Sequence, residues 1–84
     1  MKIYKYKGKC NLSGTQIRIE RERAHLSQEQ LAARLQLMEI NLSQKAISRI
    51  ETGERVVADY ELFSIAKVLN VSVYTLLGDD NGTP

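Results

Sequence analysis

One short phrase recurs along this chain: an apolar residue, a serine, and a polar stretch that leads to another apolar residue. It appears as L-S-Q-E-Q-L-A at residues 26–32 and as L-S-Q-K-A-I-S at residues 42–48. Serine is a favoured N-cap because its hydroxyl accepts a hydrogen bond from a free backbone N–H in the first helical turn. The flanking apolar residues are spaced to form a hydrophobic staple. The phrase therefore predicts that helices begin at Ser27 and Ser43.

Related phrases predict three further helix starts. L-S-G-T-Q-I offers Ser13 as a cap, V-S-V-Y-T-L offers Ser72, and Asp59 offers the fifth start. Gly53 and Asn70 suit left-handed helix ends. Apolar residues recur at the helical period in each segment, and none of these segments alternates as a strand does. The sequence thus predicts a compact all-α fold of five helices. Four of them cover about residues 13–24, 43–52, 59–69 and 72–77, and the second in chain order begins at Ser27.

The charge is unevenly distributed along the 84 residues. Residues 1–9 carry four lysines and no acid, which leaves eight of the twelve basic residues to face all ten acidic residues. A basic arm suits a polyanion, and a solvated, frayed terminus is the alternative. The alternation K-I-Y-K-Y-K at residues 2–7 also allows a short strand, which would need a partner, for example the same segment of a second subunit. We divide the chain into a basic arm (1–11), a helical domain (12–78) and a polar tail (79–84).

Several classes of function find no support in this sequence. No apolar run approaches the roughly 20 residues of a membrane span, and no signal peptide is visible. The single cysteine, Cys10, cannot form an internal disulfide, so a reducing, cytoplasmic setting is expected. Cys10 and the single histidine, His25, have no partners in a metal-binding or nucleophile motif, so we expect no metal, no cofactor and no enzymatic activity. We interpret His25 as a residue that meets the last carbonyls of the first helix.

The helix predicted at residues 43–52 has an outward face that is polar and free of acids, made of Gln44, Lys45, Ser48, Arg49 and Thr52. Glutamine can bond adenine through two hydrogen bonds, and lysine or arginine can bond guanine. Gln44, Lys45 and Ser48 lie in the part of such a helix that points at base edges, whereas Arg49 suits a base or a phosphate. Gln28 begins the preceding helix, where free N–H groups favour a phosphate. A solvated helix surface is the alternative interpretation.

Residues 17–78 resemble the Cro/repressor-type helix-turn-helix domain, the lambda repressor-like or xenobiotic-response-element family of phage repressors and bacterial regulators. The matching phrases are L-S-Q-E-Q-L-A (26–32), I-S-R-I-E-T-G (47–53) and A-K-V-L-N-V-S-V-Y-T-L-L (66–77). The resemblance implies a bundle of five helices that often dimerises and binds operator DNA. It implies that Gln28 contacts a phosphate and that Gln44, Lys45 and Arg49 read bases. It also implies a buried ion pair between Arg21 and Glu51.

The sequence departs from this family between the second and third helices. The family joins them by a tight turn of the form L-G-V-S, whereas here Leu35 is followed by Q-L-M-E-I-N before the next L-S. We expect the second helix to gain a turn and a loop to follow near residues 39–41. Leu31, Leu35 and Met38 are expected to form its inward stripe. Leu37 and Ile40 either cover the core or form an exposed apolar spot.

The sequence therefore predicts a double-stranded DNA-binding transcription regulator, most often a repressor in this family, that places residues 43–52 in the major groove. Thr52 and the arm lysines Lys5 and Lys7 are expected to add phosphate contacts. A homodimer is expected to use the apolar residues of the last helix, Val73, Tyr74 and Leu77. The alternative is a protein-interaction or antitoxin-type regulator on the same fold, which the slightly acidic globule and the lengthened turn favour.

Overall fold

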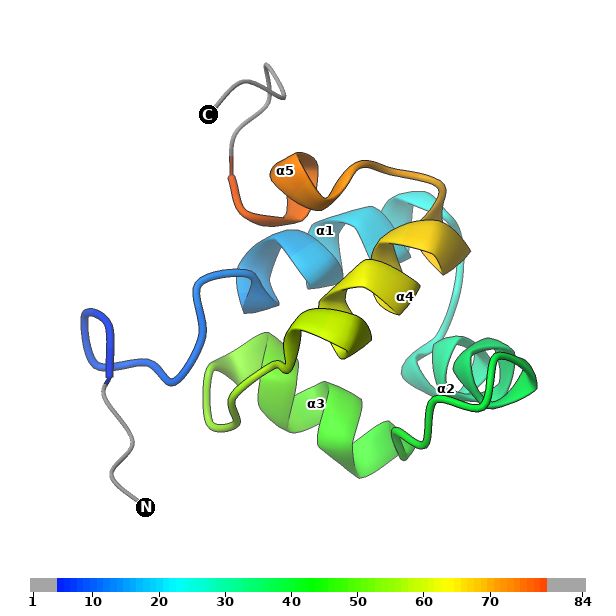
Figure 1. The fold of residues 1–84 in the computed structure, drawn as a ribbon, viewed down its shortest axis with the longest axis horizontal. Helices are drawn as coiled ribbons and strands as arrows, with labels where there is room; N and C mark the ends of the chain where they lie inside the picture. Colours follow the sequence, from blue (N-terminus) through cyan, green and yellow to red (C-terminus); the bar gives the residue numbers. More distant parts are fainter. Residues whose placement is uncertain (1–4, 79–84) are drawn as a thin grey trace.

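The computed structural model describes residues 5–78 of the chain (Figure 1). Its five helices are α1 (Gly14–Arg23), α2 (Gln28–Leu37), α3 (Gln44–Thr52), α4 (Asp59–Leu69) and α5 (Val73–Leu76). The predicted all-α fold of five helices is confirmed. Within the described residues, the one β pairing is an isolated bridge between Tyr6 and Lys9 in the arm. The polar tail and residues 2–4 of the predicted strand lie outside the described residues.

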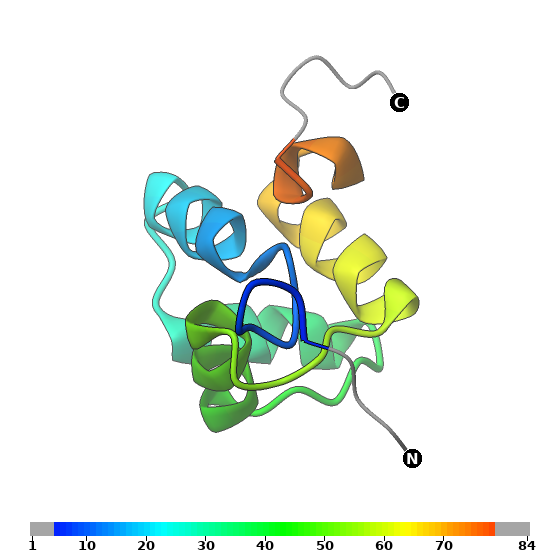
Figure 2. The same ribbon diagram turned by 90° about the vertical axis from the view of Figure 1, so that its left-hand side faces the viewer.

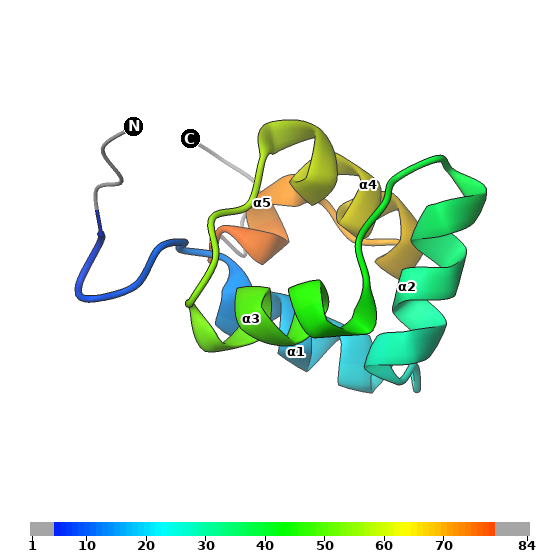
Figure 3. The ribbon, with the colours of Figure 1, turned by 90° about the horizontal axis from the view of Figure 1, so that it is seen from below.

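The core lies where the helices converge. Helix α3 packs against α1 and α2, and α4 packs against α1, α2 and α5. Viewed from below, α3 crosses the face of the molecule that is nearest the reader, with α2 beside it (Figure 3). One side of α3 is thus held by two helices while the other side faces out. The largest fully buried side chains are Ile17, Leu31, Leu35, Ile47, Ile50, Ile65 and Leu76.

Three of the predicted serine caps are confirmed. The hydroxyls of Ser27, Ser43 and Ser72 each accept a hydrogen bond from the backbone N–H three residues further on, at 3.0, 3.1 and 3.1 Å. At α2 the cap is reciprocal, because the Gln30 side-chain oxygen accepts a hydrogen bond from the Ser27 N–H at 2.8 Å. These bonds satisfy N–H groups that the first turn of a helix otherwise leaves unpaired. The recurrent phrase is therefore a capping device.

Two predicted caps are wrong. Ser13 has helical torsion angles, and its hydroxyl makes no capping bond. The side chain of Asn11 accepts the Gly14 N–H instead, at 2.8 Å. At α4 the cap is Ala58, and Asp59 is already the first helical residue. There the carboxylate of the third helical residue, Glu61, accepts the Ala58 N–H at 3.0 Å, so the helix begins one residue earlier.

A left-handed residue lies at the end of each of the five helices, and after α5 it is Gly78, at φ 89°. Gly53 and Asn70, at φ 82° and 58°, end α3 and α4 as predicted. His25 ends α1 at φ 58°, and its backbone N–H donates a hydrogen bond to the Glu22 carbonyl at 3.0 Å. Among the described residues, it is this N–H and not the imidazole that meets the last carbonyls of α1. Glu39 follows α2 at φ 61°. Such a residue reverses the chain so that the last carbonyls of the helix regain hydrogen-bond donors.

The lengthened connection between α2 and α3 begins with a reversal of the chain at Glu39. The Ile40 N–H donates to the Leu35 carbonyl at 3.0 Å, and Ile40 then packs against the core. Leu37 is 87% exposed, which makes it the exposed apolar spot. Met38 is 39% exposed, so its predicted place on the inward stripe is wrong. The helix ends before Met38 can turn inward, and Ile40 covers the core in its place.

A close contact joins the start of α1 to the end of α3. The Asn11 side-chain amide donates to the backbone oxygens of Ile50 and Arg55, at 2.9 and 2.7 Å. Gly14 lies so near that a Cβ on it would overlap the backbone oxygen of Ile50. A backbone atom cannot move away as a side-chain end can, so only glycine fits this approach.

We therefore expect Gly14→Ala to lower the free energy of unfolding by about 1–3 kcal/mol, as overpacking does. The gain in helix propensity, about 1 kcal/mol, acts in the opposite direction and is smaller than a backbone overlap. Urea unfolding measures the difference. Thr15→Ala, one position further on and exposed, is the control and is expected to change stability by less than about 0.5 kcal/mol. A Gly14→Ala variant at least as stable as the parent would show that α1 and α3 are further apart.

Candidate nucleic-acid interface

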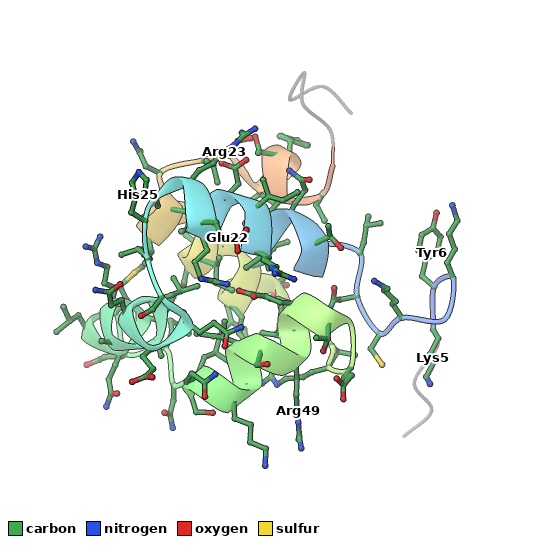
Figure 4. The ribbon with its side chains drawn as sticks, turned by 180° about the vertical axis from the view of Figure 1, so that it is seen from behind. Lys5, Tyr6, Glu22, Arg23, His25 and Arg49 are labelled. Carbon is green, nitrogen blue, oxygen red and sulfur yellow. The ribbon has the colours of Figure 1, made fainter. Side chains whose placement is uncertain are left out.

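The two sides of α3 differ in chemistry. Ile47, Ile50 and Glu51 are buried against α1 and α2. Figure 4 shows Arg49 pointing away from the body of the molecule. Neither exposed cation of the helix forms an ion pair with a residue that the structure describes. The free side carries Gln44, Lys45, Arg49 and Thr52, which are exposed, and Ser48, which is half-buried.

The inner side of α3 is fixed by an ion pair to α1. Arg21 Nε lies 2.7 Å from Glu51 Oε2, and Arg21 Nη2 donates to Glu51 Oε1 at 3.0 Å. The side chains are 11% and 3% exposed. The third arginine nitrogen, Nη1, donates to the Leu26 carbonyl at 2.8 Å. The hydrogen bond to Glu51 raises the pKa of Arg21 above its ordinary value, although burial alone would lower it, so the guanidinium stays charged.

This ion pair continues into the helix-turn-helix surface through two glutamines. Glu51 Oε1 accepts a hydrogen bond from Gln28 Nε2 at 3.0 Å. Gln28 Oε1 in turn accepts a hydrogen bond from Gln44 Nε2 at 2.6 Å. We call these four residues the Arg21–Gln44 chain: Arg21, Glu51, Gln28 and Gln44. It links α1, the start of α2 and both ends of α3.

The chain determines how the Gln44 amide is oriented. An ionised carboxylate only accepts hydrogen bonds, so Gln28 must turn its NH₂ toward Glu51 and its oxygen toward Gln44. Gln44 must therefore turn its NH₂ toward Gln28. It retains its oxygen and one N–H for a partner outside the protein. An acceptor and a donor side by side match the N6 amino group and N7 of adenine.

The remaining predicted phosphate contacts of the helical domain differ in their surroundings. Gln28, half-buried at the first position of α2, retains one amide N–H after its two bonds. The Thr52 hydroxyl lies 2.8 Å from a carboxylate oxygen of Glu54 and 3.2 Å from two carbonyls of its own helix. A phosphate would have to displace Glu54 from Thr52. Thr52 is therefore the less favourably placed of the two.

The structure separates the two arm lysines. Tyr6 and Lys9 exchange backbone hydrogen bonds of 2.7 and 3.0 Å, so the arm forms a tight hairpin. The Lys7 ammonium lies over the Tyr6 ring, 5.4 Å from its centre. In Figure 4 Lys5 points toward the side on which Arg49 projects, whereas Tyr6 points the opposite way. Lys5 is thus on the α3 side of the hairpin and Lys7 is not.

The residues predicted for association lie at the other end of the molecule. Figure 1 shows α5 and α3 on opposite sides of the bundle. Tyr74 is 43% and Leu77 38% exposed, and Val73 is half-buried against the core. A groove of about 550 Å³ lies between α1 and α5, with Ile19 and Val71 in its walls.

The match to a known family agrees with this geometry. A helix-turn-helix family model matches residues 17–76, well over half of the chain. The chain belongs to the lambda repressor-like helix-turn-helix family. It is a DNA-binding domain of the kind that regulates transcription. Members of this family are not typically enzymes. No curated protein and no solved structure matches it significantly.

Two negative findings concern other kinds of site in this helix-turn-helix domain. Over residues 5–78, no three histidine, cysteine or acidic side chains come together as metal ligands would. None of the helices described is long and apolar enough to cross a membrane.

Sequence reasoning missed the residues whose role depends on tertiary contact. The sequence pattern indicates no role for Asn11 and Gly14, and it predicts separate contacts for Gln28 and Gln44. One local signal does point to the cap: Asn11 lies three positions before Gly14, and an asparagine side chain can accept a backbone N–H at that distance along the chain. No local pattern shows that Gln28 and Gln44 touch, because they are 16 residues apart.

We expect Arg21 and Glu51 to be strongly coupled in stability. Removing one partner should cost on the order of 3–5 kcal/mol, because the other is left as an uncompensated buried charge. Replacing both by apolar residues should cost much less than the sum of the single changes. Urea unfolding of Arg21→Met, Glu51→Leu and the double variant measures the coupling.

The exposed pair Arg18–Glu22, 3.5 Å apart and more than half exposed, serves as the control. Its cycle should give no more than about 0.5 kcal/mol. Equal coupling in the two cycles would contradict the buried arrangement of Arg21 and Glu51.

Proposed function

We propose that this chain binds double-stranded DNA sequence-specifically, with α3 in the major groove, and regulates transcription as a repressor. The observation that carries the proposal is the orientation of Gln44. Its amide is held by the Arg21–Gln44 chain and presents a free acceptor and a free donor in the first turn of a helix with an acid-free outer face. A side chain that is already oriented loses less conformational entropy on binding a base.

The neighbouring side chains support the same interface. Lys45 and Arg49 are exposed cations on the outer face of α3 and suit guanine or phosphate. Ser48 is half-buried between them and can contact a base edge only if the helix enters deeply. Gln28 offers its remaining N–H to a phosphate at the start of α2, where the helix dipole favours an anion. Of the further phosphate contacts that the sequence predicts, we retain Thr52 and Lys5 for this interface, whereas the Lys7 ammonium lies over the Tyr6 ring.

Repression is the simpler of the two regulatory outcomes. A repressor needs only to occupy its operator, whereas an activator must also contact the transcription machinery. The described residues form a compact domain in which the outer face of α3 is polar and free of acids, and binding through such a face is sufficient to occupy an operator. The cytoplasm is the corresponding setting for such a regulator.

We further propose that two copies associate through α5. Tyr74 in the four-residue helix α5 and Leu77 directly after it expose apolar surface, and the groove between α1 and α5 lies beside them. A twofold arrangement would bury the same surface on both subunits. Such a dimer presents two α3 helices to half-sites about one helical turn apart.

One observation favours a second function, the binding of a protein partner. Apolar side chains are also exposed outside α5, at the end of α2 and on α4. Leu37 is 87%, Met38 39%, Tyr60 61% and Phe63 54% exposed. These side chains come from two helices that pack against each other, and large exposed apolar side chains suit the surface of a protein partner. An antitoxin-type regulator would use such a surface while α3 remained available to DNA.

We expect Gln44→Ala to lose about 1–3 kcal/mol of discrimination at one base pair of a specific site. Binding to unrelated duplexes should change little, because phosphate contacts dominate there. Titration of duplexes that differ at single base pairs measures both quantities. Gln36→Ala, an exposed glutamine of α2 outside the Arg21–Gln44 chain, is the control and should alter neither. Equal weakening of specific and unrelated duplexes by Gln44→Ala would remove Gln44 from base reading.

We expect Leu77→Asp to weaken self-association, because a charge would have to be desolvated in an apolar contact. Sedimentation equilibrium over a range of concentrations measures the dimerisation constant. Leu37→Asp makes the same chemical change at an exposed leucine elsewhere and should leave dimerisation unaltered. The opposite pattern, with Leu37→Asp disruptive and Leu77→Asp neutral, would move the interface to the end of α2.

A further inference from the structure

We propose that the N-terminal hairpin, residues 5–9, is a preformed second DNA-binding element with a fixed position relative to α3. In it Lys5, and not Lys7, contacts the phosphate backbone beyond the end of α3. The inference rests on the proposed function, since it assumes that α3 meets duplex DNA. It goes beyond that function in three ways. It names a second DNA-binding surface, a contact with the phosphate backbone beyond α3, and a difference between two lysines that the sequence pattern treats alike.

The base of the hairpin is attached to the C-terminal end of α3. The Cys10 N–H donates to the Gly53 carbonyl at 2.8 Å. The side-chain carbons of Lys9 cover Gly53 so closely that a Cβ there would lie 2.8–3.0 Å from them. Asn11 completes the attachment through its bonds to Ile50 and Arg55. Figure 2, seen from this end of the molecule, shows the hairpin in front of the end of α3.

The turn of the hairpin decides where its lysines point. Lys7 and Gly8 both have positive φ, 52° and 81°, as the two central residues of a tight two-residue hairpin turn do. Side chains of a strand alternate between its faces, so an extended arm would place Lys5 and Lys7 on the same face. The left-handed conformation at Lys7 breaks this alternation and brings its ammonium over the Tyr6 ring.

Lys5, by contrast with Lys7, faces the side of the molecule on which the outer face of α3 is exposed. Lys5 is exposed and points toward the side on which Arg49 projects (Figure 4). Viewed from the α3 side, the hairpin extends outward past the end of α3 (Figure 3). A duplex whose major groove holds α3 continues on that side as phosphate backbone. An ammonium on a preformed element meets it with little loss of chain entropy.

The matched variants Lys5→Ala and Lys7→Ala test this proposal. Each removes one positive charge from an exposed position of the same hairpin, so non-directional attraction predicts equal effects. Binding to one long duplex is measured over a series of salt concentrations. We expect Lys5→Ala to reduce the slope of log K against log salt by about 0.9, the value of one lost phosphate contact. Lys7→Ala should leave the slope unchanged.

A second measurement locates the contact. A shorter duplex that retains the base pairs under α3 but ends before the backbone under the hairpin should bind the parent and Lys5→Ala equally. Equal slope changes for the two lysines, or an Lys5→Ala effect that persists on the short duplex, would overturn the fixed geometry. Parent-like slopes for both variants would show that the hairpin does not touch DNA.

These failures differ from failure of the proposed function. If α3 does not read DNA, the parent protein shows no preference among duplexes and Gln44→Ala has no base-specific effect. In that case the hairpin proposal fails as well. If base discrimination through Gln44 persists while both lysine variants behave like the parent, only the hairpin proposal fails. Circular dichroism spectra that match the parent establish that both variants fold.

Discussion

The buried ion pair between Arg21 and Glu51 is the interaction on which the rest of this domain depends. Each charge would be very costly to bury alone, so the two residues must meet, and their meeting fixes α3 against α1. The free lone pair of the carboxylate then orients Gln28, which orients Gln44. The ion pair that we expect to stabilise the domain thus also sets the direction of a side chain on the outer face of α3.

Local chemistry made much of the fold predictable. Serine hydroxyls, glycine and asparagine announce helix starts and ends through bonds within a few residues, and three of five caps and two left-handed ends followed from them. Ser13 and Asp59 failed because other acceptors serve these helix starts: the amide oxygen of Asn11 accepts the Gly14 N–H, and the carboxylate of Glu61 accepts the Ala58 N–H. Competition of this kind depends on which side chain reaches the helix end, and the serine signal does not reveal it.

The candidate site was predictable in its residues but not in its connections. The polar face of α3 follows from helical spacing alone. The contact between Gln28 and Gln44, the close approach at Gly14 and the division of Lys5 from Lys7 arise from distant segments or from a left-handed turn. The lengthened connection likewise required the reversal at Glu39, which let Ile40 replace Met38 against the core. A glutamate carries little signal for such a backbone conformation, since left-handed non-glycine residues are uncommon.

Selection of bound sequences from a random duplex pool most directly tests whether this chain reads base pairs. We expect enrichment of a palindromic site whose half-sites lie about 10 base pairs apart, as two α3 helices related by a twofold axis require. Each half-site should contain an A·T pair whose preference disappears in a parallel selection with Gln44→Ala. A pool that remains random after repeated rounds, although the protein is folded, would contradict sequence-specific recognition through α3.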